Sequence, residues 1–169
     1  QNCLVLTAPS KTFNLAGLQT SNIFVPNEAL RRKLEEFLKR GSANPKCNIL
    51  GYKACEIAYS SCGEWLDECI QVIDENRRVI TEFMAENFPQ IRVCELQATY
   101  LLWMDWNGLG LDYKELERIN RQEAGLFFDE GYIFGAQGEG FERWNLACPT
   151  SYVVAALKRM KEAYGKYVK

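Results

Sequence analysis

The chain has 169 residues, of which 47% are hydrophobic and 25% charged, and its formal net charge is −2. This composition is close to the globular average and excludes an intrinsically disordered chain. The slight acidity argues against nucleic acid as a partner, because phosphate contacts need a basic surface. No apolar run approaches the roughly 18 residues of a membrane span, so we expect no membrane partner. These exclusions leave a globular protein with a sizeable hydrophobic core.

The sequence contains no histidine. This excludes Ser-His and Cys-His catalytic pairs, histidine zinc ligands and an imidazole base. No two of the seven cysteines are separated by only two residues, which excludes a zinc ribbon or thioredoxin-like motif, and we expect no metal. We interpret the cysteines as small buried residues in the reducing cytoplasm.

The first third of the chain predicts two strands and a helix. Residues 3–8 form an uncharged apolar run, typical of a strand buried on both faces of a parallel sheet. Residues 21–26 are also strand-like, and Asn27 caps a helix that ends at Gly41. A buried strand needs neighbours, and none precedes this one. Because the chain also begins at Gln1 without an initiator Met, we expect a piece of a longer protein.

Two helices are predicted in the middle of the chain. The turn-forming Asn44-Pro45 precedes a helical stretch that runs to about Cys62, and Gly63 interrupts it. A long amphipathic helix then covers residues 64–87, with apolar side chains at helical spacing.

The last part of the chain predicts a small antiparallel sheet covered by helices. The expected strands are residues 91–94, 100–106, 126–128 and 141–147, with a glycine-rich loop before the last one. Asp112 caps a short helix, and Thr150 or Ser151 caps the final one. The fold class is therefore α/β at the start of the chain, followed by long helices and a compact α+β domain. The corresponding regions are residues 1–40, 41–89 and 90–169.

Lys11 follows the first predicted strand. The carboxyl end of a buried strand opens into the ligand crevice of α/β sheets, where partial desolvation lowers a lysine pKa and suits it to Schiff-base chemistry. Taken alone, a Ser-Lys pair is a weak signal, because solvated lysines after strands are common.

The wider sequence around Lys11 is more specific. Residues 10–18, Ser-Lys-Thr-Phe-Asn-Leu-Ala-Gly-Leu, resemble the lysine motif of pyridoxal-phosphate enzymes of the aspartate aminotransferase superfamily, fold type I. Residues 141–149, Phe-Glu-Arg-Trp-Asn-Leu-Ala-Cys-Pro, resemble the family's Arg-x-Asn-x-Ala segment. The cystathionine β-lyase, or C–S lyase, branch is indicated by Ala58-Tyr59, Gly63, Trp65-Leu66-Asp67 and Ala98-Thr99-Tyr100-Leu101. The resemblance runs almost end to end, but only to the C-terminal portion of such enzymes.

The resemblance implies roles for three residues. Lys11 would form the internal aldimine with pyridoxal 5'-phosphate and then act as base on the substrate Cα–H. Ser10 would donate its hydroxyl to the cofactor phosphate. Arg143 would bind the α-carboxylate of an amino-acid substrate with its planar fork; its alternative is a surface arginine on a strand. Gln19 departs from the wider superfamily, which often has a phosphate-binding arginine there, and this leaves the phosphate contacts open.

The resemblance also implies what precedes Lys11 in such enzymes. The aspartate on the pyridine nitrogen, the ring-stacking aromatic and the glycine-rich phosphate turn all come before the lysine in the family. Residues 1–40 would then be the C-terminal edge of an incomplete cofactor-binding domain, and the missing N-terminal part of the polypeptide would be a required partner. The complete enzyme would be a homodimer, and this chain by itself would be nearly inactive.

Three hypotheses about function follow. The favoured one is β-elimination from a cysteine thioether by a C–S lyase. Transamination shares its first steps, and no residue here separates the two. The third reading is a non-catalytic interaction domain, in which an exposed strand edge pairs with another chain.

Other local patterns favour plainer interpretations. The glycine-rich loop precedes a strand rather than joining a strand to a helix, so it is no nucleotide-binding motif and instead lets the backbone bend. Trp103, Trp106 and Tyr100 could stack on bases, but an aromatic-rich core strand is commoner. Asp129 and Glu130 could form an acid/base pair, but adjacent residues on a turn usually face solvent.

Overall fold

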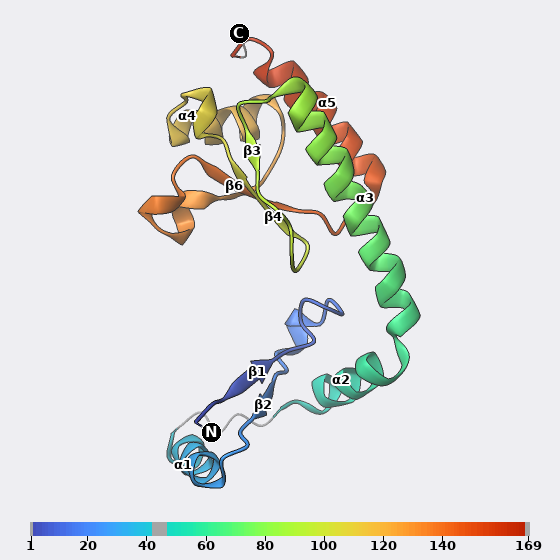
Figure 1. Ribbon diagram of the computed structural model, residues 1–169, viewed down its shortest axis with the longest axis vertical. Coiled ribbons are helices and arrows are strands. Elements are labelled where there is room, and N and C mark those ends of the chain that lie inside the picture. The colour runs from blue at the N-terminus through green and yellow to red at the C-terminus, as the bar shows by residue number, and fades with distance from the viewer. Residues whose placement is uncertain (1, 42–46, 168–169) are drawn as a thin grey trace. The chain divides into compact units, whose positions relative to one another are not determined.

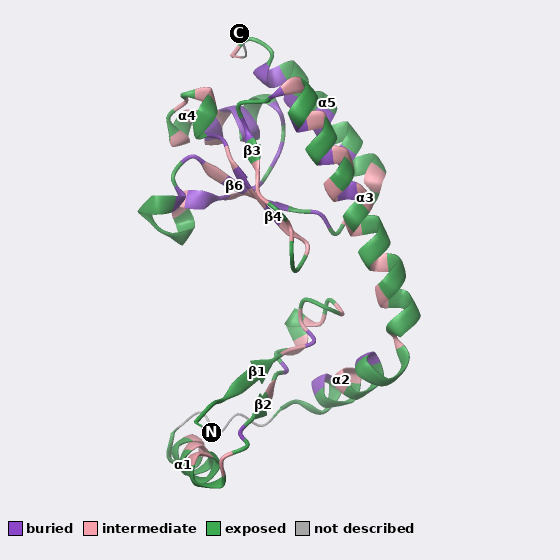
Figure 2. Cartoon of the chain, in the orientation of Figure 1, coloured by how far each residue is buried: buried purple, intermediate pink, exposed green. Residues whose placement is uncertain are grey.

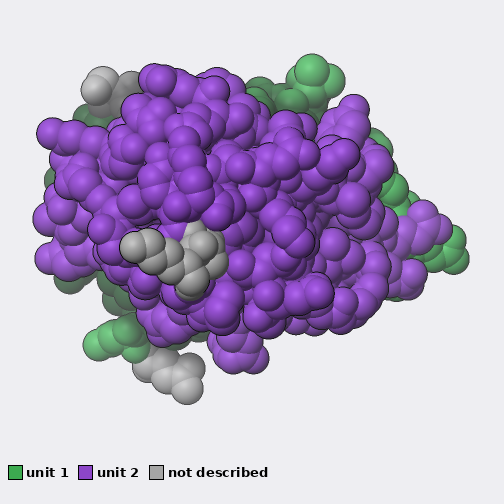
Figure 3. Space-filling view, turned by 90° about the horizontal axis from the view of Figure 1, so that it is seen from above, with its two compact units in different colours: residues 1–67 green, residues 68–169 purple. Residues whose placement is uncertain are grey.

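The computed structural model describes residues 2–41 and 47–167. The chain divides into two compact units, residues 1–67 and 68–169 (Figure 3). The helices are α1 (Glu28–Arg40), α2 (Ile49–Ser61), α3 (Gly63–Asn87), α4 (Tyr113–Arg118) and α5 (Thr150–Tyr164). The strands are β1 (Val5–Thr7), β2 (Asn22–Phe24), β3 (Arg92–Val93), β4 (Leu101–Asp105), β5 (Asp129–Glu130) and β6 (Phe141–Asn145) (Figure 1). No helix within the described ranges is long and apolar enough to cross a membrane.

The first unit contains a two-stranded ribbon and two helices. β1 and β2 are antiparallel, with Val5 opposite Phe24. The expectation of a strand buried on both faces over residues 3–8 is wrong for this structure, because Leu6 is 68% exposed and the whole of β1 is exposed (Figure 2). The apolar run forms a strand, but no second layer of this unit covers it.

The helices of the first unit begin where asparagine side chains cap them. The Asn27 side chain accepts a hydrogen bond from the Leu30 N–H at 3.1 Å, and α1 ends at Gly41, which confirms both predictions. Asn48 caps α2 in the same way, accepting from the Gly51 N–H at 2.7 Å. The predicted turn at residues 44–45 lies outside the described residues.

The second unit is built on a four-stranded antiparallel sheet with the order β3-β4-β6-β5. The predicted strands at residues 91–94, 100–106 and 141–147 are present in shorter form. The predicted strand at residues 126–128 is wrong, because the strand there is β5, Asp129–Glu130. Leu126 and Phe128 are buried in the core instead, and the Leu126 N–H donates to the carbonyl of Asn120 rather than to a strand. The burial of these two side chains did not require a β-ladder.

Side chains from α3, α5 and one face of the sheet form the core of the second unit. Its fully buried members include Ile80, Met84, Leu102, Met104, Leu146 and Met160. The predicted cap of α5 by Thr150 or Ser151 is wrong: Pro149 occupies the capping position, and no side chain caps the helix. Pro149 has extended backbone angles, so the two hydroxyl residues already lie inside the first turn.

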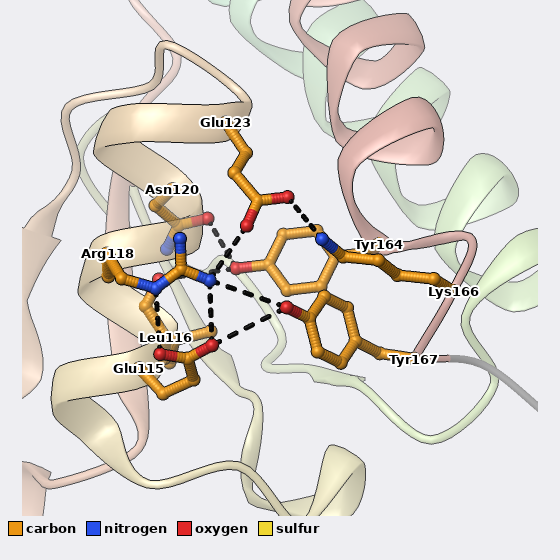
Figure 4. Close-up of polar contacts among 8 residues, drawn as sticks. All are labelled: Glu115, Leu116, Arg118, Asn120, Glu123, Tyr164, Lys166 and Tyr167. Atoms are coloured by element: carbon orange, nitrogen blue, oxygen red, sulfur yellow. Dashed lines mark hydrogen bonds and ion pairs between the residues drawn. The ribbon is translucent and has the colours of Figure 1, made fainter.

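The end of α5 is joined to α4 by a cluster of charged side chains (Figure 4). Arg118 donates to Glu115 and to Glu123 at 2.7 Å each, and Lys166 donates to Glu123 at 2.8 Å. The Tyr167 hydroxyl lies 3.4 Å from the Arg118 guanidinium. These contacts hold Lys166 and Tyr167 beside α4 and the segment that leads into β5.

The seven cysteines are all described and are free thiols. The interpretation that they are buried is wrong. Cys3 and Cys47 are exposed, and the other five are half-buried. Cys55 lies on α2, and Cys62 follows the end of that helix; position on a helix does not determine how much of a side chain is covered.

Candidate active site

The loop that carries Lys11 joins β1 to β2. Its turn is closed by hydrogen bonds from the Phe13 N–H to the Pro9 carbonyl at 2.9 Å and from the Leu15 N–H to the Ser10 carbonyl at 3.1 Å. Lys11 is exposed and Ser10 is half-buried. The expectation that Lys11 directly follows a buried strand is wrong in detail, because β1 ends at Thr7 and is itself exposed. The unit presents the lysine on a closed turn rather than in a desolvated crevice.

Aromatic contacts anchor this loop to the helices. The ring of Phe13 meets Tyr59 of α2 edge-on, with centroids 5.3 Å apart, and stacks on Trp65 of α3 at 6.4 Å. Asn14 adopts a left-handed conformation with φ of 54°, which asparagine tolerates better than most residues. The loop geometry is therefore set by side chains two and three residues after Lys11.

Arg143 lies in the middle of a row of side chains that crosses three strands. It is directly opposite Trp103 of β4 on one side and Asp129 of β5 on the other. Its Nε and Nη2 donate to Asp129 Oδ2 at 3.0 and 2.7 Å. The guanidinium carbon lies 4.6 Å from the centre of the Phe134 ring, a cation–π distance. Arg143 is thus half-buried and held in place by an ion pair and a ring.

The neighbouring residue, Glu142, faces the core because successive strand residues point to opposite faces. Its side chain is 2% exposed, and its Oε1 accepts a hydrogen bond from Asn120 Nδ2 at 3.2 Å. Burial, together with the negative charge of Glu130, raises the pKa of Glu142 to about 8. Glu130 is directly opposite on β5 and is itself paired with Arg121 at 2.8 Å.

The expectation that Asp129 and Glu130 face solvent on a turn is therefore wrong. They form β5, and their side chains point to opposite faces of the sheet. Glu130 is 7% exposed, and Asp129 pairs with Arg143. The aromatic prediction is confirmed for Trp106, which is 1% exposed in the core. Trp103 is half-buried and stacks on Phe141 at 5.4 Å.

The glycine-rich loop bends through two short 3₁₀ turns before β6, as predicted. A Cβ on Gly131 would lie 2.1 Å from the carbonyl oxygen of Gly138, and a Cβ on Gly138 would meet Gly131 at 2.0 Å. Only glycine permits this backbone contact. It closes the loop that carries Phe134 toward Arg143.

The predicted site residues thus fall into two groups. Ser10 and Lys11 are adjacent in the first unit, whereas Arg143 belongs to the second, and each is placed within its own unit. Sequence reasoning missed Asp129 and Phe134 as partners of Arg143. The two-residue alternation along β6 was the available signal, but the partner strand was predicted two residues too early to use it. In the described ranges no three Cys, Asp or Glu side chains are grouped to hold a metal ion.

A model of the family described as aminotransferase class I and II matches residues 1–160. The chain belongs to this family. The expected family and fold type are therefore confirmed. Among solved structures of relatives, cystalysin from Treponema denticola, which contains a pyridoxal 5'-phosphate cofactor, has a TM-score of 0.90 and 44% identity over 98% of this chain and 42% of that one.

Other members of the aminotransferase class I and II family are similar along most of this chain. Cystathionine beta-lyase PatB of Bacillus subtilis is 36% identical over 156 residues, 92% of this chain and 40% of PatB. Cystathionine beta-lyase of Corynebacterium glutamicum is 32% identical over 166 residues, 94% of this chain and 41% of that protein. A PLP-bound putative aminotransferase from Clostridium difficile has a TM-score of 0.88 and 36% identity over 96% of this chain and 42% of that one. The chain spans about 40% of the length of the curated relatives that it matches.

Proposed function

We propose that this chain carries the lysine and the carboxylate-binding arginine of a pyridoxal-phosphate-dependent C–S lyase. The observation that carries the proposal is its 36% identity to a cystathionine beta-lyase over 92% of the chain. The match to the family model covers residues 1–160 and so includes both the Lys11 and the Arg143 segments. The geometry supports it, because Arg143 is a half-buried guanidinium on a rigid strand rather than a mobile surface side chain. That arrangement suits recognition of a carboxylate.

The chemistry of the residues present fits two parts of the cofactor. Lys11 supplies the primary amine that would hold its aldehyde, and Ser10 supplies a hydroxyl that would donate to its phosphate. The two residues are adjacent on a turn closed by the Ser10 carbonyl. When bound, pyridoxal phosphate supplies an electron-withdrawing ring that makes the substrate Cα–H acidic.

The chain's own residues would then bind the substrate and move one proton. Arg143 would fix the α-carboxylate and so orient the Cα–H and the Cβ–S bond. Lys11 Nζ would take the Cα proton as the Cβ–S bond breaks, and the sulfur would leave with the bonding electron pair as a thiolate. Overall, a cysteine thioether and water would give a thiol, pyruvate and ammonia.

The chain would act as the C-terminal part of a longer polypeptide. Residues 1–40 would then be the edge of the cofactor-binding domain, residues 41–89 the connecting helices and residues 90–169 the small domain. The coverage of about 40% of the relatives supports the view that this chain is part of a longer polypeptide. We also propose that the complete enzyme is a cytoplasmic homodimer, to which the seven free thiols are suited.

Transamination is the second candidate, favoured by the family description and by the Clostridium difficile relative. It shares Cα proton removal by Lys11 and carboxylate binding by Arg143. The two reactions differ in what happens next, because transamination returns a proton and exchanges the amino group with a keto acid.

The test uses the complete protein, expressed from the reading frame upstream of Gln1, with L-cystathionine as the probe. We expect stoichiometric release of thiol and pyruvate, and borohydride reduction of the cofactor-loaded protein should label Lys11. Lys11→Ala should lower kcat by roughly 10²–10⁴, and Arg143→Lys should raise KM by roughly tenfold. Lys33→Ala, at an exposed lysine of α1, is the matched control and should change neither.

Three results would count against the proposal. Keto-acid exchange without thiol release would make the protein an aminotransferase. A start codon just before Gln1, with no reading frame upstream, would favour the non-catalytic interaction domain. Full activity of Lys11→Ala would remove the lysine from the mechanism altogether. In the 169-residue chain alone, we expect the cofactor to label surface lysines without preference for Lys11.

A further inference from the structure

The guanidinium of Arg143 has two edges that can bind an oxygen pair: the side edge, Nε with Nη2, and the end edge, Nη1 with Nη2. Asp129 uses the side edge with a single oxygen, Oδ2, at 3.0 Å from Nε and 2.7 Å from Nη2. Within the described part of the chain, Nη1 donates no hydrogen bond to another residue. The end edge therefore remains available for a second carboxylate.

Aromatic contacts also fix the orientation of the Arg143 guanidinium plane. Phe134 packs over one face of it, with the guanidinium carbon 4.6 Å from the ring centre. Phe134 in turn meets Trp103 edge-on at 5.7 Å, and Trp103 stacks on Phe141 at 5.4 Å. Because these rings project from β4, β6 and the closed glycine-rich loop, they limit rotation of the guanidinium out of its plane.

We propose that Asp129 is a positioning residue, which holds the side edge of Arg143 so that the end edge is presented to the α-carboxylate of the substrate. This inference rests on the proposed function, in which Arg143 binds that carboxylate. An arginine side chain that must be ordered on binding loses rotamer freedom at that moment. The Asp129 ion pair orders Arg143 beforehand, so less affinity is lost when the substrate binds. Asp129 is 46% exposed, so water screens its charge from the incoming carboxylate.

The opposite role for Asp129 is a competitor that must leave Arg143 before substrate binds. The two roles predict different nitrogen atoms in contact with an added carboxylate. A positioned guanidinium accepts the carboxylate at Nη1 and Nη2, and Nε stays on Asp129. A blocked guanidinium exchanges Asp129 for the carboxylate, so Nε changes partner.

The experiment is a titration of the ¹⁵N-labelled 169-residue chain with sodium acetate, with sodium chloride as the ionic-strength control. The Arg143 side-chain signals are assigned by their loss in Arg143→Lys. We expect acetate to shift the Nη signals and to leave the Nε signal in place. In Asp129→Ala, the Nε signal should move as well, because the side edge is then open.

Affinity provides a second measurement that a purely structural role would not change. Asp129→Asn and Asp129→Ala both remove the charge, but only asparagine keeps an acceptor oxygen for Nε and Nη2. Because the charge of Asp129 is lost in both variants, a difference between them reports the hydrogen bond and not the charge. We expect acetate to bind about fivefold more weakly to Asp129→Ala than to Asp129→Asn, as one lost neutral hydrogen bond predicts. Unchanged backbone amide signals of Glu130 and Glu142 check that β5 and β6 are still paired in both variants.

Two results would overturn the positioning role of Asp129: equal acetate affinity in the two variants, or an Nε signal that moves with acetate in the unmodified chain. Either result would leave the carboxylate-binding role of Arg143 standing. If acetate shifts no Arg143 nitrogen beyond the chloride control, Arg143 is not a carboxylate site. The proposed role of Arg143 then fails first, and the inference about Asp129 fails with it.

Discussion

Replacing Glu142 by glutamine should stabilise the second unit at neutral pH. Glu142 is 2% exposed, lies opposite the arginine-paired Glu130, and has an Oε2 atom without a hydrogen-bond partner. Glu117 also raises its pKa, whereas the Asn120 hydrogen bond and the charge of Arg121 lower it, and burial outweighs both. The folded chain therefore keeps this carboxyl protonated.

The size of the effect follows from the difference in pKa between the two states. The carboxyl of Glu142 ordinarily titrates at 4.5, and in the folded chain at about 8. Its contribution to stability is fully present below pH 4.5 and is lost as the pH rises to about 8. Each unit of pH in that interval removes about 1.4 kcal/mol, so the loss at pH 7 is about 3 kcal/mol.

Glutamine stays neutral at every pH and keeps the oxygen that accepts from Asn120. Its amide nitrogen would lie where Oε2 now has no partner, which costs about 1 kcal/mol. The net gain of Glu142→Gln at pH 7 is therefore about 2 kcal/mol. At pH 5 the gain should vanish or reverse, because this pH is only half a unit above the unfolded pKa of 4.5, so the loss that glutamine removes is then below about 1 kcal/mol.

The assay is urea unfolding followed by tryptophan fluorescence, because Trp106 and Trp144 lie in the core of the second unit. Stability is measured between pH 5.5 and 8. The absence of histidine removes the side chains that ordinarily titrate in this window. Carboxyls with lowered pKa values, such as those of Glu115 and Glu123, are ionised throughout it. The difference in slope between the unmodified chain and Glu142→Gln can therefore be assigned to this carboxyl.

A matched control is Glu139→Gln, at an exposed glutamate three residues earlier, which should leave the slope unchanged. The reasoning is refuted if the unmodified chain shows no loss of stability from pH 5.5 to 8. It is equally refuted if Glu142→Gln retains the slope of the unmodified chain.

Two further predictions concern the contacts that support the strand of Arg143. Asn76→Ala should lower the free energy of unfolding by about 3 kcal/mol, because buried Asn76 donates to the carbonyls of Leu146 and Cys148 at 2.9 and 2.8 Å. Urea unfolding measures this free energy, and a loss below about 1 kcal/mol would contradict the prediction. Gly131→Ala should lower the free energy of unfolding by about 2–3 kcal/mol, since its Cβ would lie 2.1 Å from a backbone oxygen. The control Gly17→Ala, whose Cβ would have nothing within 4 Å, should lower it far less in the same measurement.

Local sequence patterns determined much of this fold. The caps at Asn27 and Asp112 are present as predicted, because a cap depends only on a side chain and the backbone within three residues of it. The break between the two long helices near Gly63 follows from the same short-range rules. Along α5, Leu157 and Met160 recur at helical spacing and are both buried in the core, because the helix period brings them to the same face.

Local sequence patterns did not predict how strands that are far apart in the sequence pair with one another. The segment predicted as a strand at residues 126–128 is a loop that buries Leu126 and Phe128 and exposes Phe127, because apolar composition does not indicate which backbone finds a ladder partner. β1 has the composition of a buried strand and is nevertheless exposed in this unit, because composition does not supply the layer that covers it.

The sequence by itself determined the family and predicted the roles of Lys11, Ser10 and Arg143, because a lysine motif and an arginine motif are each contiguous and carry their chemistry in residue type. Only the tertiary structure decided that Asp129 holds Arg143 and that the adjacent Glu142 is buried beside a like charge. Both depend on the register of β5 against β6. A register is the outcome of packing the whole sheet on its core, and a shift of one residue would send every one of these side chains to the other face.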